Sequence, residues 1–433
     1  MKEFARYVAL NILGMLGLSC YILADTFFIA NGIGVNALAA LNLALPVYSL
    51  IHGCGLMLGI GGSTRYAYAQ ARGDSPSAHI AFTHAIMVGA GMSAAFMLAG
   101  ALFPGLIARL LGADESTLPM SRAYLQTILL FSPAFLLNEI LLCFSRCDGA
   151  PGMAMLAMIG GSLSNIALDG VMILLLHGGM FGAALATGIA PLVSTAILLP
   201  FLAGKKRRFR AVRCRFRPRL ASHLLSCGAS ALVTELSSGV VMLTCNTAML
   251  KLSGNTGVAA YGVIANLSLV VTAVYTGVAQ GIQPLVSRAY GRGQISRVHS
   301  VLRYALVAVW ALSVPILAAV WIQADAIALL FNAQGDPLLQ AIAVPGLKTV
   351  FSGCAFSGMS IVLCSYFASI DVPQPAGALS ILRGVALIVP LIPLFSRLAG
   401  IRGLWLAFPA TECIAFLIGW ALLRRIGPAV GRS

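Results

Sequence analysis

The feature that most constrains this chain is a series of apolar segments, each long enough to cross a membrane, that recurs along all 433 residues. An α-helix needs about 20 apolar residues to span a hydrocarbon core of about 30 Å. Only 9% of the residues are charged, whereas a soluble domain has roughly 25%. The sequence therefore predicts an all-α integral membrane protein with twelve transmembrane helices, at residues 8–30, 36–64, 79–103, 121–145, 153–176, 180–203, 223–249, 257–286, 301–322, 343–368, 376–396 and 403–423.

The distribution of Lys and Arg predicts the orientation in the membrane. Cytoplasmic loops retain positive charge during insertion, and with both termini inside, the inner loops hold Arg72, Arg288 and the basic run 205–219. The net charge of +15 is therefore a topology signal, and we expect no nucleic-acid partner. The first segment contains Asp25 and no cleavage pattern follows it, so we expect it to stay in the membrane. The predicted location is the cell (inner) membrane, multi-pass, with both termini cytoplasmic.

The two halves of the chain are related by an internal repeat. A shift of 220 positions superposes residues 59–74 on 279–294 and places Gly61 on Gly281. Six spans return the chain to its starting side, so two such units have the same orientation and are related by a pseudo-two-fold axis along the membrane normal. We predict two six-helix bundles: an N-terminal lobe (1–203), a basic cytoplasmic linker (204–221) and a C-terminal lobe (222–433).

Few ionisable side chains fall inside the predicted spans. A charged group at the centre of a membrane helix costs about 2.5–3.5 kcal/mol, so each one is a candidate functional residue. Asn165 and Asp169 lie four residues apart on one helix face. They either stitch helices together by hydrogen bonds or form part of an ion or proton site. A lone histidine in a span, His52, is interpreted as a packed residue. The acids inside the spans are Asp25, Glu139, Asp169, Glu235 and Glu412.

Five stretches of the sequence resemble the multidrug and toxic compound extrusion (MATE) family: "ADTFFIANGIGVNALAALNLALPVY", "YAQARGD", "FSRCDGAPGMAM", "SNIALDG" and "GMFGAALATGIAP". The resemblance covers essentially the whole chain, including the duplication. It implies the MATE/MOP fold, with two bundles of six helices arranged as a V. It also implies a secondary-active multidrug exporter that antiports sodium or protons against bulky, often cationic compounds by alternating access.

The resemblance also implies an ion-coupling site in the N-terminal lobe, made by Asp25, Asn165, Asp169 and Thr187. A carboxylate that is buried beside a second carboxylate binds a proton more readily, so the two aspartates suit proton exchange. Alternatively, carboxylate, amide and hydroxyl oxygens suit a hard cation such as sodium. Both coupling ions, H⁺ and Na⁺, stay open, and we expect no other cofactor.

The repeat confines this site to one lobe. At a shift of 220, Asp25 falls on Cys245, and the region matching Asp169 contains no acid. The C-terminal lobe also lacks the helix 10 acid of one family branch. In helix 1 the proline that many members carry is absent; Asn11, Gly14 and Gly17 occupy that region, and glycine also permits a kink.

We expect a substrate cavity of apolar, aromatic and acidic side chains, which accepts cationic drugs or metabolites of many shapes. Glu235 resembles the helix 7 acid of members in which that acid faces the cavity. We expect the protein to work as a monomer in the lipid bilayer. The candidate cavity residues are Glu235, Tyr21, Met57, Tyr261 and Glu412.

Three other function classes are weaker. A membrane enzyme would need a nucleophile or metal constellation, and no such motif is recognisable. A channel suits two large lobes with buried carboxylates less well than gated exchange does. The main alternative is a lipid-linked oligosaccharide flippase of the same superfamily. Its cavity would be lined with Arg and Lys, whereas the predicted spans offer chiefly Arg303 and Arg383.

Overall fold

The computed structural model describes residues 1–205, 207–332 and 336–430, apart from the side chains of Val35 and 426–430. Its regular elements within these ranges are helical. In chain order they are α1 (Lys2–Gly32), α2 (Val35–Ala71), α3 (Ser75–Leu102), α4 (Pro104–Leu110), α5 (Leu118–Leu130), α6 (Ser132–Cys147), α7 (Pro151–Asp169), the π-helical turn η1 (Gly170–Leu175), α8 (Gly179–Ala203), α9 (Pro218–Gly291), α10 (Ile295–Phe331), α11 (Pro337–Phe351), α12 (Cys354–Ser369), α13 (Pro373–Ile381), the π-helical turn η2 (Leu382–Ala386) and α14 (Ile388–Val430).

These helices make twelve membrane crossings, as predicted. Two continuous helical stretches, Pro218–Gly291 and Pro373–Arg425, are 74 and 53 residues long, far more than one crossing needs. Each breaks at a non-helical pair that ends in a glycine with positive φ, Gly254 (62°) and Gly400 (57°). Glycine adopts this conformation without a steric penalty, so each stretch folds back and crosses twice.

Two spans that the sequence predicts as single helices are bent. The helix expected at 121–145 is divided into α5 and α6, which meet at 48°, and the helix expected at 343–368 into α11 and α12, which meet at 47°. Pro133 stands in the first turn of α6, where its missing N–H interrupts the helical hydrogen bonds. At the second bend Gly353 packs against the backbone of Pro409, and a Cβ atom there would lie 2.6 Å from the Pro409 Cα.

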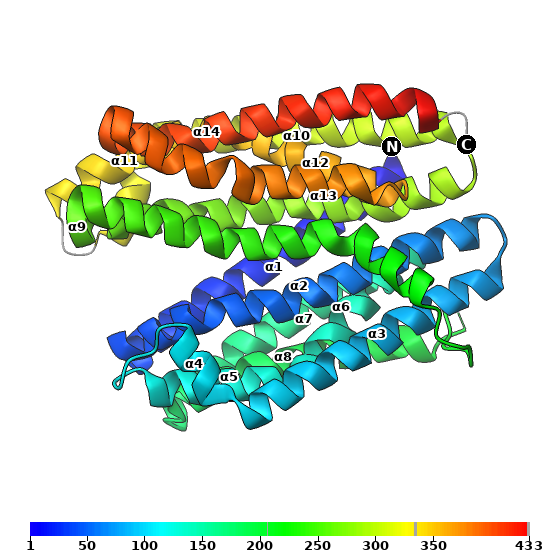
Figure 1. The fold of residues 1–433 in the computed structure, drawn as a ribbon, viewed down its shortest axis with the longest axis horizontal. Helices are drawn as coiled ribbons and strands as arrows, with labels where there is room; N and C mark the ends of the chain where they lie inside the picture. The colour runs from blue at the N-terminus through cyan, green and yellow to red at the C-terminus, as the bar shows by residue number, and fades with distance from the viewer. Residues whose placement is uncertain (206, 333–335, 431–433) are drawn as a thin grey trace.

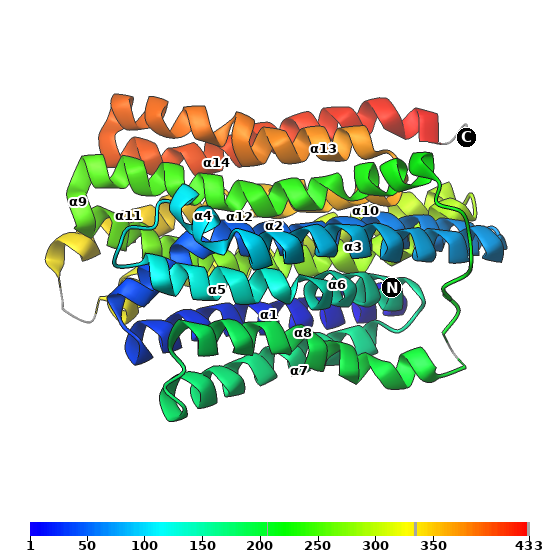
Figure 2. The same ribbon diagram turned by 60° about the horizontal axis from the view of Figure 1, so that its bottom comes forward.

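The helices form two lobes that lie side by side, α1–α8 and α9–α14 (Figures 1 and 2). The beginning of α1 and the end of α14 lie at the same end of the molecule (Figure 1), as an even number of crossings requires. We call this the basic end, because its connections carry Arg72, Arg208 and Arg292, and the opposite one the far end. Each lobe has its own hydrophobic core, but Tyr7 and Val8 of α1 belong to the core of the other lobe.

The internal repeat is visible where the lobes touch. Gly61 of α2 packs on the Leu224 carbonyl of α9, and a Cβ atom at Gly61 would overlap that oxygen. Gly281, which the repeat superposes on Gly61, makes the matching contact with Val8 of α1, where a Cβ atom would lie 2.8 Å from the Val8 Cα. Small residues let membrane helices approach closely. The two glycines therefore allow matching close contacts on the two sides of the interface between the lobes.

The basic connection between the lobes is attached to the N-terminal lobe. It is extended from Arg207 to Arg217, and α9 begins at Pro218, so the last four residues of the predicted 204–221 linker are helical. Proline is favoured in the first turn of a helix. Phe209 is fully buried and packs against Phe82 with ring centroids 4.8 Å apart. The Val212 N–H donates to Thr83 Oγ1 at 3.0 Å.

Candidate functional site

The four residues predicted to bind the coupling ion are all buried in the N-terminal lobe. Asp25 lies on α1, Asn165 and Asp169 on the last turns of α7, and Thr187 on α8. Asn165 and Asp169 are fully buried, and Asp25 is 8% exposed. Asp169 is the last residue before the π-helical turn η1. Such turns occur often at functional sites.

The carboxyl groups of Asp25 and Asp169 lie close enough to interact electrostatically. Among the described residues, no hydrogen-bond partner reaches either oxygen of Asp169, the amide oxygen or nitrogen of Asn165, or Oδ1 of Asp25. Buried polar atoms are nearly always paired, and two carboxylates that face each other offer only acceptors. The two carboxyl groups can therefore share a proton or bind a cation.

Tyr124 of α5 lies beside these residues, and no sequence pattern predicted it. Its hydroxyl interacts with the Thr187 hydroxyl and lies near both aspartates. Thr187 Oγ1 itself donates to the Ala183 carbonyl at 3.0 Å, so its lone pairs are left to accept. Thr187 is thus connected to the aspartates through Tyr124, a tyrosine on a short helix that sequence patterns alone do not single out.

A row of polar side chains leads from this pair to the boundary between the lobes. Tyr21 lies one helical turn before Asp25, and its hydroxyl shares a hydrogen bond with the hydroxyl of Tyr48 on α2. The Tyr48 ring stacks on His52, with centroids 6.0 Å apart. His52 Nδ1 in turn lies 3.7 Å from Glu139 Oε1. His52 is therefore packed against Tyr48, as interpreted from sequence, and it also lies in this row beside Glu139.

Glu235 faces this row from the other lobe. It interacts with both His52 and Glu139, and its Cβ would lie 3.2 Å from a Cβ atom built on Gly53 of α2. Two carboxylates and an imidazole thus meet between α2, α6 and α9. Such a group can hold an organic cation or a proton at the interface of the lobes.

The other candidate cavity residues lie elsewhere, and their predicted contact with substrate stays a prediction. Met57 is buried where α2 crosses α9. Tyr261 packs inside the C-terminal lobe against Trp405, with ring centroids 6.4 Å apart. Glu412 is paired with Arg383 of η2: Arg383 NH2 donates to Glu412 Oε1 at 2.6 Å and to Ser357 Oγ at 3.1 Å. Tyr21 and Glu235 alone among the five join the row described above.

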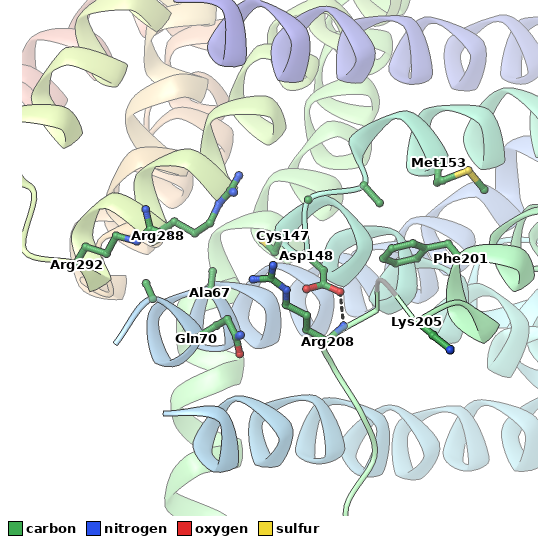
Figure 3. A pocket seen from close by; sticks show the side chains of 13 residues that line it. Ala67, Gln70, Cys147, Asp148, Met153, Phe201, Lys205, Arg208, Arg288 and Arg292 are labelled. Atoms are coloured by element: carbon green, nitrogen blue, oxygen red, sulfur yellow. Dashed lines mark hydrogen bonds between the residues drawn. The ribbon is translucent and has the colours of Figure 1, made fainter. Parts of the chain in front are cut away.

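A cavity of about 670 Å³ opens at the basic end (Figure 3). It lies between the end of α2, the α6–α7 connection and the end of α9, and several basic side chains line it. Asp148 accepts hydrogen bonds from Tyr66 Oη at 2.6 Å and from the Arg208 N–H at 2.8 Å, the second drawn as a dashed line in Figure 3. Burial raises the pKa of the Asp148 carboxyl, which stands in a connection outside the spans. The basic residues are Lys205, Arg208, Arg288 and Arg292.

Comparison with known proteins gives consistent results. The MatE family model matches residues 11–171 and 222–394. "Multidrug export protein MepA" of Staphylococcus saprophyticus is 24% identical over 418 residues, which are 96% of this chain and 92% of that protein. The "FAD transporter" of Shewanella oneidensis is 26% identical over 430 residues, with the same coverage of 96% and 92%.

Among solved structures, one described as the "outward-facing conformation of a multidrug resistance MATE family transporter of the MOP superfamily" has a TM-score of 0.93 and 22% identity. The similarity covers 100% of this chain and 97% of that one. This likeness shows that the two chains share a fold.

Proposed function

Because the chain belongs to the MatE family, the multidrug and toxic compound extrusion (MATE) transporters, we propose that it exports bulky cationic and amphipathic compounds across the cell membrane in exchange for sodium ions or protons. The family consists of membrane transporters and not of enzymes, as the sequence predicts. The substrate class, the coupling ion and the alternation between two states belong to the proposal.

The observation that carries this proposal is the buried pair of Asp25 and Asp169, to which no described donor is bound. A fixed structural hydrogen-bond network would leave the carboxylates paired with donors. A pair without donors is instead stabilised when a proton or a sodium ion binds between its carboxyl groups. With Asn165 and the hydroxyls of Tyr124 and Thr187 nearby, the site offers the oxygen donors that a hard cation prefers.

Coupling to the exported compound runs along the polar row. Loading the pair with a cation changes the charge next to Tyr21, which is hydrogen-bonded to Tyr48. Tyr48 stacks on His52, His52 Nδ1 lies 3.7 Å from Glu139 Oε1, and both His52 and Glu139 act electrostatically on Glu235 of the other lobe. A substrate cation held by these two carboxylates is thereby disfavoured when the coupling ion is bound. Such a difference in affinity between two states is what antiport requires.

The basic end is the cytoplasmic end in this proposal, as the positive-inside rule predicts. In the described ranges, the side-chain hydrogen bonds that cross between the lobes lie toward this end, for example from Gln283 Nε2 to Ser63 Oγ at 2.9 Å and from Arg288 NH2 to Tyr7 Oη at 2.9 Å. In this proposal the structure represents the state that is closed toward the cytoplasm. Export requires a second state in which these bonds are broken.

No observation favours the flippase alternative over the exporter. Arg383 is neutralised by Glu412, and Arg303 is exposed on the surface of α10. Neither arginine offers a free positive charge to a lipid diphosphate between the lobes.

The decisive experiment is efflux of a fluorescent organic cation from proteoliposomes under an imposed sodium gradient or an imposed proton gradient. We expect export under one of the two gradients, and its loss in Asp25→Asn and in Asp169→Asn. Asp114→Asn is the matched control, because Asp114 lies in an exposed connection between α4 and α5. FAD is tested as a second cargo, because one relative is named for its transport. Undiminished export in both variants, or export of FAD but of no cation, would overturn the proposal.

A further inference from the structure

A second group of chemically active side chains lies at the basic end, within the C-terminal lobe. His223 and Cys227 are one helical turn apart in the first turns of α9, and Asp371 stands in the connection between α12 and α13. One ligand atom from each residue, an imidazole nitrogen, the thiol sulfur and a carboxylate oxygen, lies within 4.8 Å of the others. Among the described residues, this is the one group of at least three such side chains close enough to hold a metal ion.

The separations within the group are close to those around a zinc ion. Cys227 Sγ lies 3.4 Å from Asp371 Oδ1. His223 approaches Cys227 Sγ with Nδ1 and Asp371 Oδ1 with Nε2, each at 3.7 Å. Only one of these nitrogens can bind the ion, and with one ligand atom from each residue the three atoms lie within 4.8 Å of one another. Zinc bonds of about 2.0–2.3 Å in a tetrahedron place ligand atoms about 3.3–3.8 Å apart. The His223 side chain is 39% exposed, so an ion has access from solvent. A water molecule can then complete the coordination as the fourth ligand.

The same carboxylate also connects the two lobes. Asp371 Oδ2 lies 3.3 Å from NH1 of Arg65, which belongs to α2 of the N-terminal lobe. Oδ1 of Asp371 faces His223 and Cys227 of its own lobe. One acid thus contributes both to the contact between the lobes and to the candidate metal site.

The counterpart of Asp371 in the repeat shows that this arrangement is specific to one lobe. At a shift of 223 positions Asp371 corresponds to Asp148. Asp148 accepts from Tyr66 and from the Arg208 N–H, both on the N-terminal side of the molecule. Among the described residues it has no histidine or thiol in a metal-binding group and makes no ion pair with the other lobe.

We propose that His223, Cys227 and Asp371 bind a thiophilic divalent cation, Zn²⁺, and that its binding loosens the closure of the lobes at the basic end. Zinc takes the cysteine as a thiolate, so one proton leaves the thiol on binding. The ion then carries two positive charges against one thiolate and one carboxylate, and the site is neutral. Arg65 loses the net negative charge that holds it to Asp371. Occupancy of the site therefore favours the state in which the lobes separate at this end.

Binding is tested with the purified full-length protein and Zn²⁺ alone, by competition with a chelating dye whose absorbance reports free zinc. We expect one ion per chain, and at least about a tenfold loss of affinity in Cys227→Ser. The matched control is Cys147→Ser, because Cys147 is also buried at the basic end and lies outside the group. His223→Gln serves as a second test in case Cys227→Ser does not fold, because the His223 side chain is partly exposed. It should show the same loss of zinc affinity. Equal affinity in all four proteins, or no binding up to millimolar zinc, would overturn the site.

The effect on the lobes is tested by hydrogen–deuterium exchange of the peptides that cover residues 60–72 and 277–292, which contact each other at the basic end. We expect Zn²⁺ to accelerate exchange in these peptides in the wild type and to have no effect in Cys227→Ser. Arg65→Ala should show the faster exchange without zinc. Zinc binding that leaves exchange unchanged, or that slows it, would overturn the proposed loosening. None of these readouts depends on which compound the protein exports.

Discussion

The two lobes differ in whether the acids inside their helices have a counter-charge. In the N-terminal lobe Asp25 and Asp169 face each other, and no donor in the described parts of the chain reaches either oxygen of Asp169. In the C-terminal lobe Glu412 is held by Arg383 and also accepts a hydrogen bond from Ser357 Oγ at 3.2 Å. The two lobes are copies of one unit, so the difference lies in the side chains and not in the fold.

Glu412 has a counter-charge from the protein itself, whereas Asp25 and Asp169 have none among the described residues. A buried ion pair is compensated within the protein, and breaking it is costly. An uncompensated pair of acids is stable only with a proton or cation taken from solution. The predictions below test this difference.

The largest effect is expected from breaking the compensated pair. Arg383→Ala leaves the partly buried Glu412 without its counter-charge, which should lower the free energy of unfolding by about 1–3 kcal/mol. The measurement is thermal or denaturant unfolding in detergent. The double variant Arg383→Met with Glu412→Leu should recover most of that loss, because neither charge then remains. A double variant no more stable than Arg383→Ala would contradict the pairing.

The second effect is expected in the uncompensated pair, and it concerns transport and not stability. Asp169→Asn removes one charge and keeps the shape, so the melting temperature should stay the same or rise. Coupled export should fall by about 5- to 150-fold, the range that typical coupling free energies cover. Export and melting are measured on the same preparation. A variant that loses stability as Arg383→Ala does would show that Asp169 is a structural residue.

A smaller effect is expected along the row that leaves the N-terminal site. Tyr21→Phe and Tyr48→Phe each remove one hydroxyl from the hydrogen bond that the two residues share. A double-mutant cycle on unfolding should give a coupling energy of about 0.5–1.5 kcal/mol. Each single variant should also weaken the dependence of export on the ion gradient. Additive effects in the cycle would mean that the two hydroxyls act separately.

The smallest effect of protonation is expected at Asp114, which lies outside the spans and accepts hydrogen bonds from residues close to it in the sequence. Asp114 accepts from the Thr117 N–H at 2.9 Å and from Thr117 Oγ1 at 2.7 Å, and these bonds lower its pKa to about 2. Because the folded-state pKa is depressed, the stabilisation is complete above the unfolded value of about 3.9. It is lost as the pH falls through about 2. Amide exchange near the start of α5 should therefore be insensitive to protonation of Asp114 between pH 8 and 5, after correction for intrinsic rates. Protonation-dependent loosening in that range would contradict the assignment.

Local patterns were sufficient for the membrane spans and the repeat, whereas the ion-coupling role of the N-terminal residues stays a prediction. Apolar length predicts crossings because every crossing needs the same amount of hydrocarbon. The match of Gly61 with Gly281 indicated the repeat, and the structure places both glycines at close contacts between the lobes. Proximity of Asp25 to Asp169 was suggested by the family resemblance and not by spacing, because the two residues lie on helices far apart in the chain.

Partners that come from other helices could not be predicted in this way. Tyr124 reaches Thr187 only because α5 bends away from α6 and packs on α8. Glu412 is an isolated acid in the sequence, and its pairing with Arg383 depends on how η2 packs against α14. The same holds for His52, whose contact with Glu139 joins α2 to α6.

The sequence by itself determined a duplicated twelve-helix membrane protein and the N-terminal location of its unpaired acids, because hydropathy, repeat spacing and residue type are properties of the chain. The tertiary structure decided which acids inside the helices have a counter-charge or donor and which have none in the described parts of the chain. The physical reason is that compensation requires a donor or counter-charge within about 3–4 Å. In a helical membrane protein such a partner generally comes from a different helix.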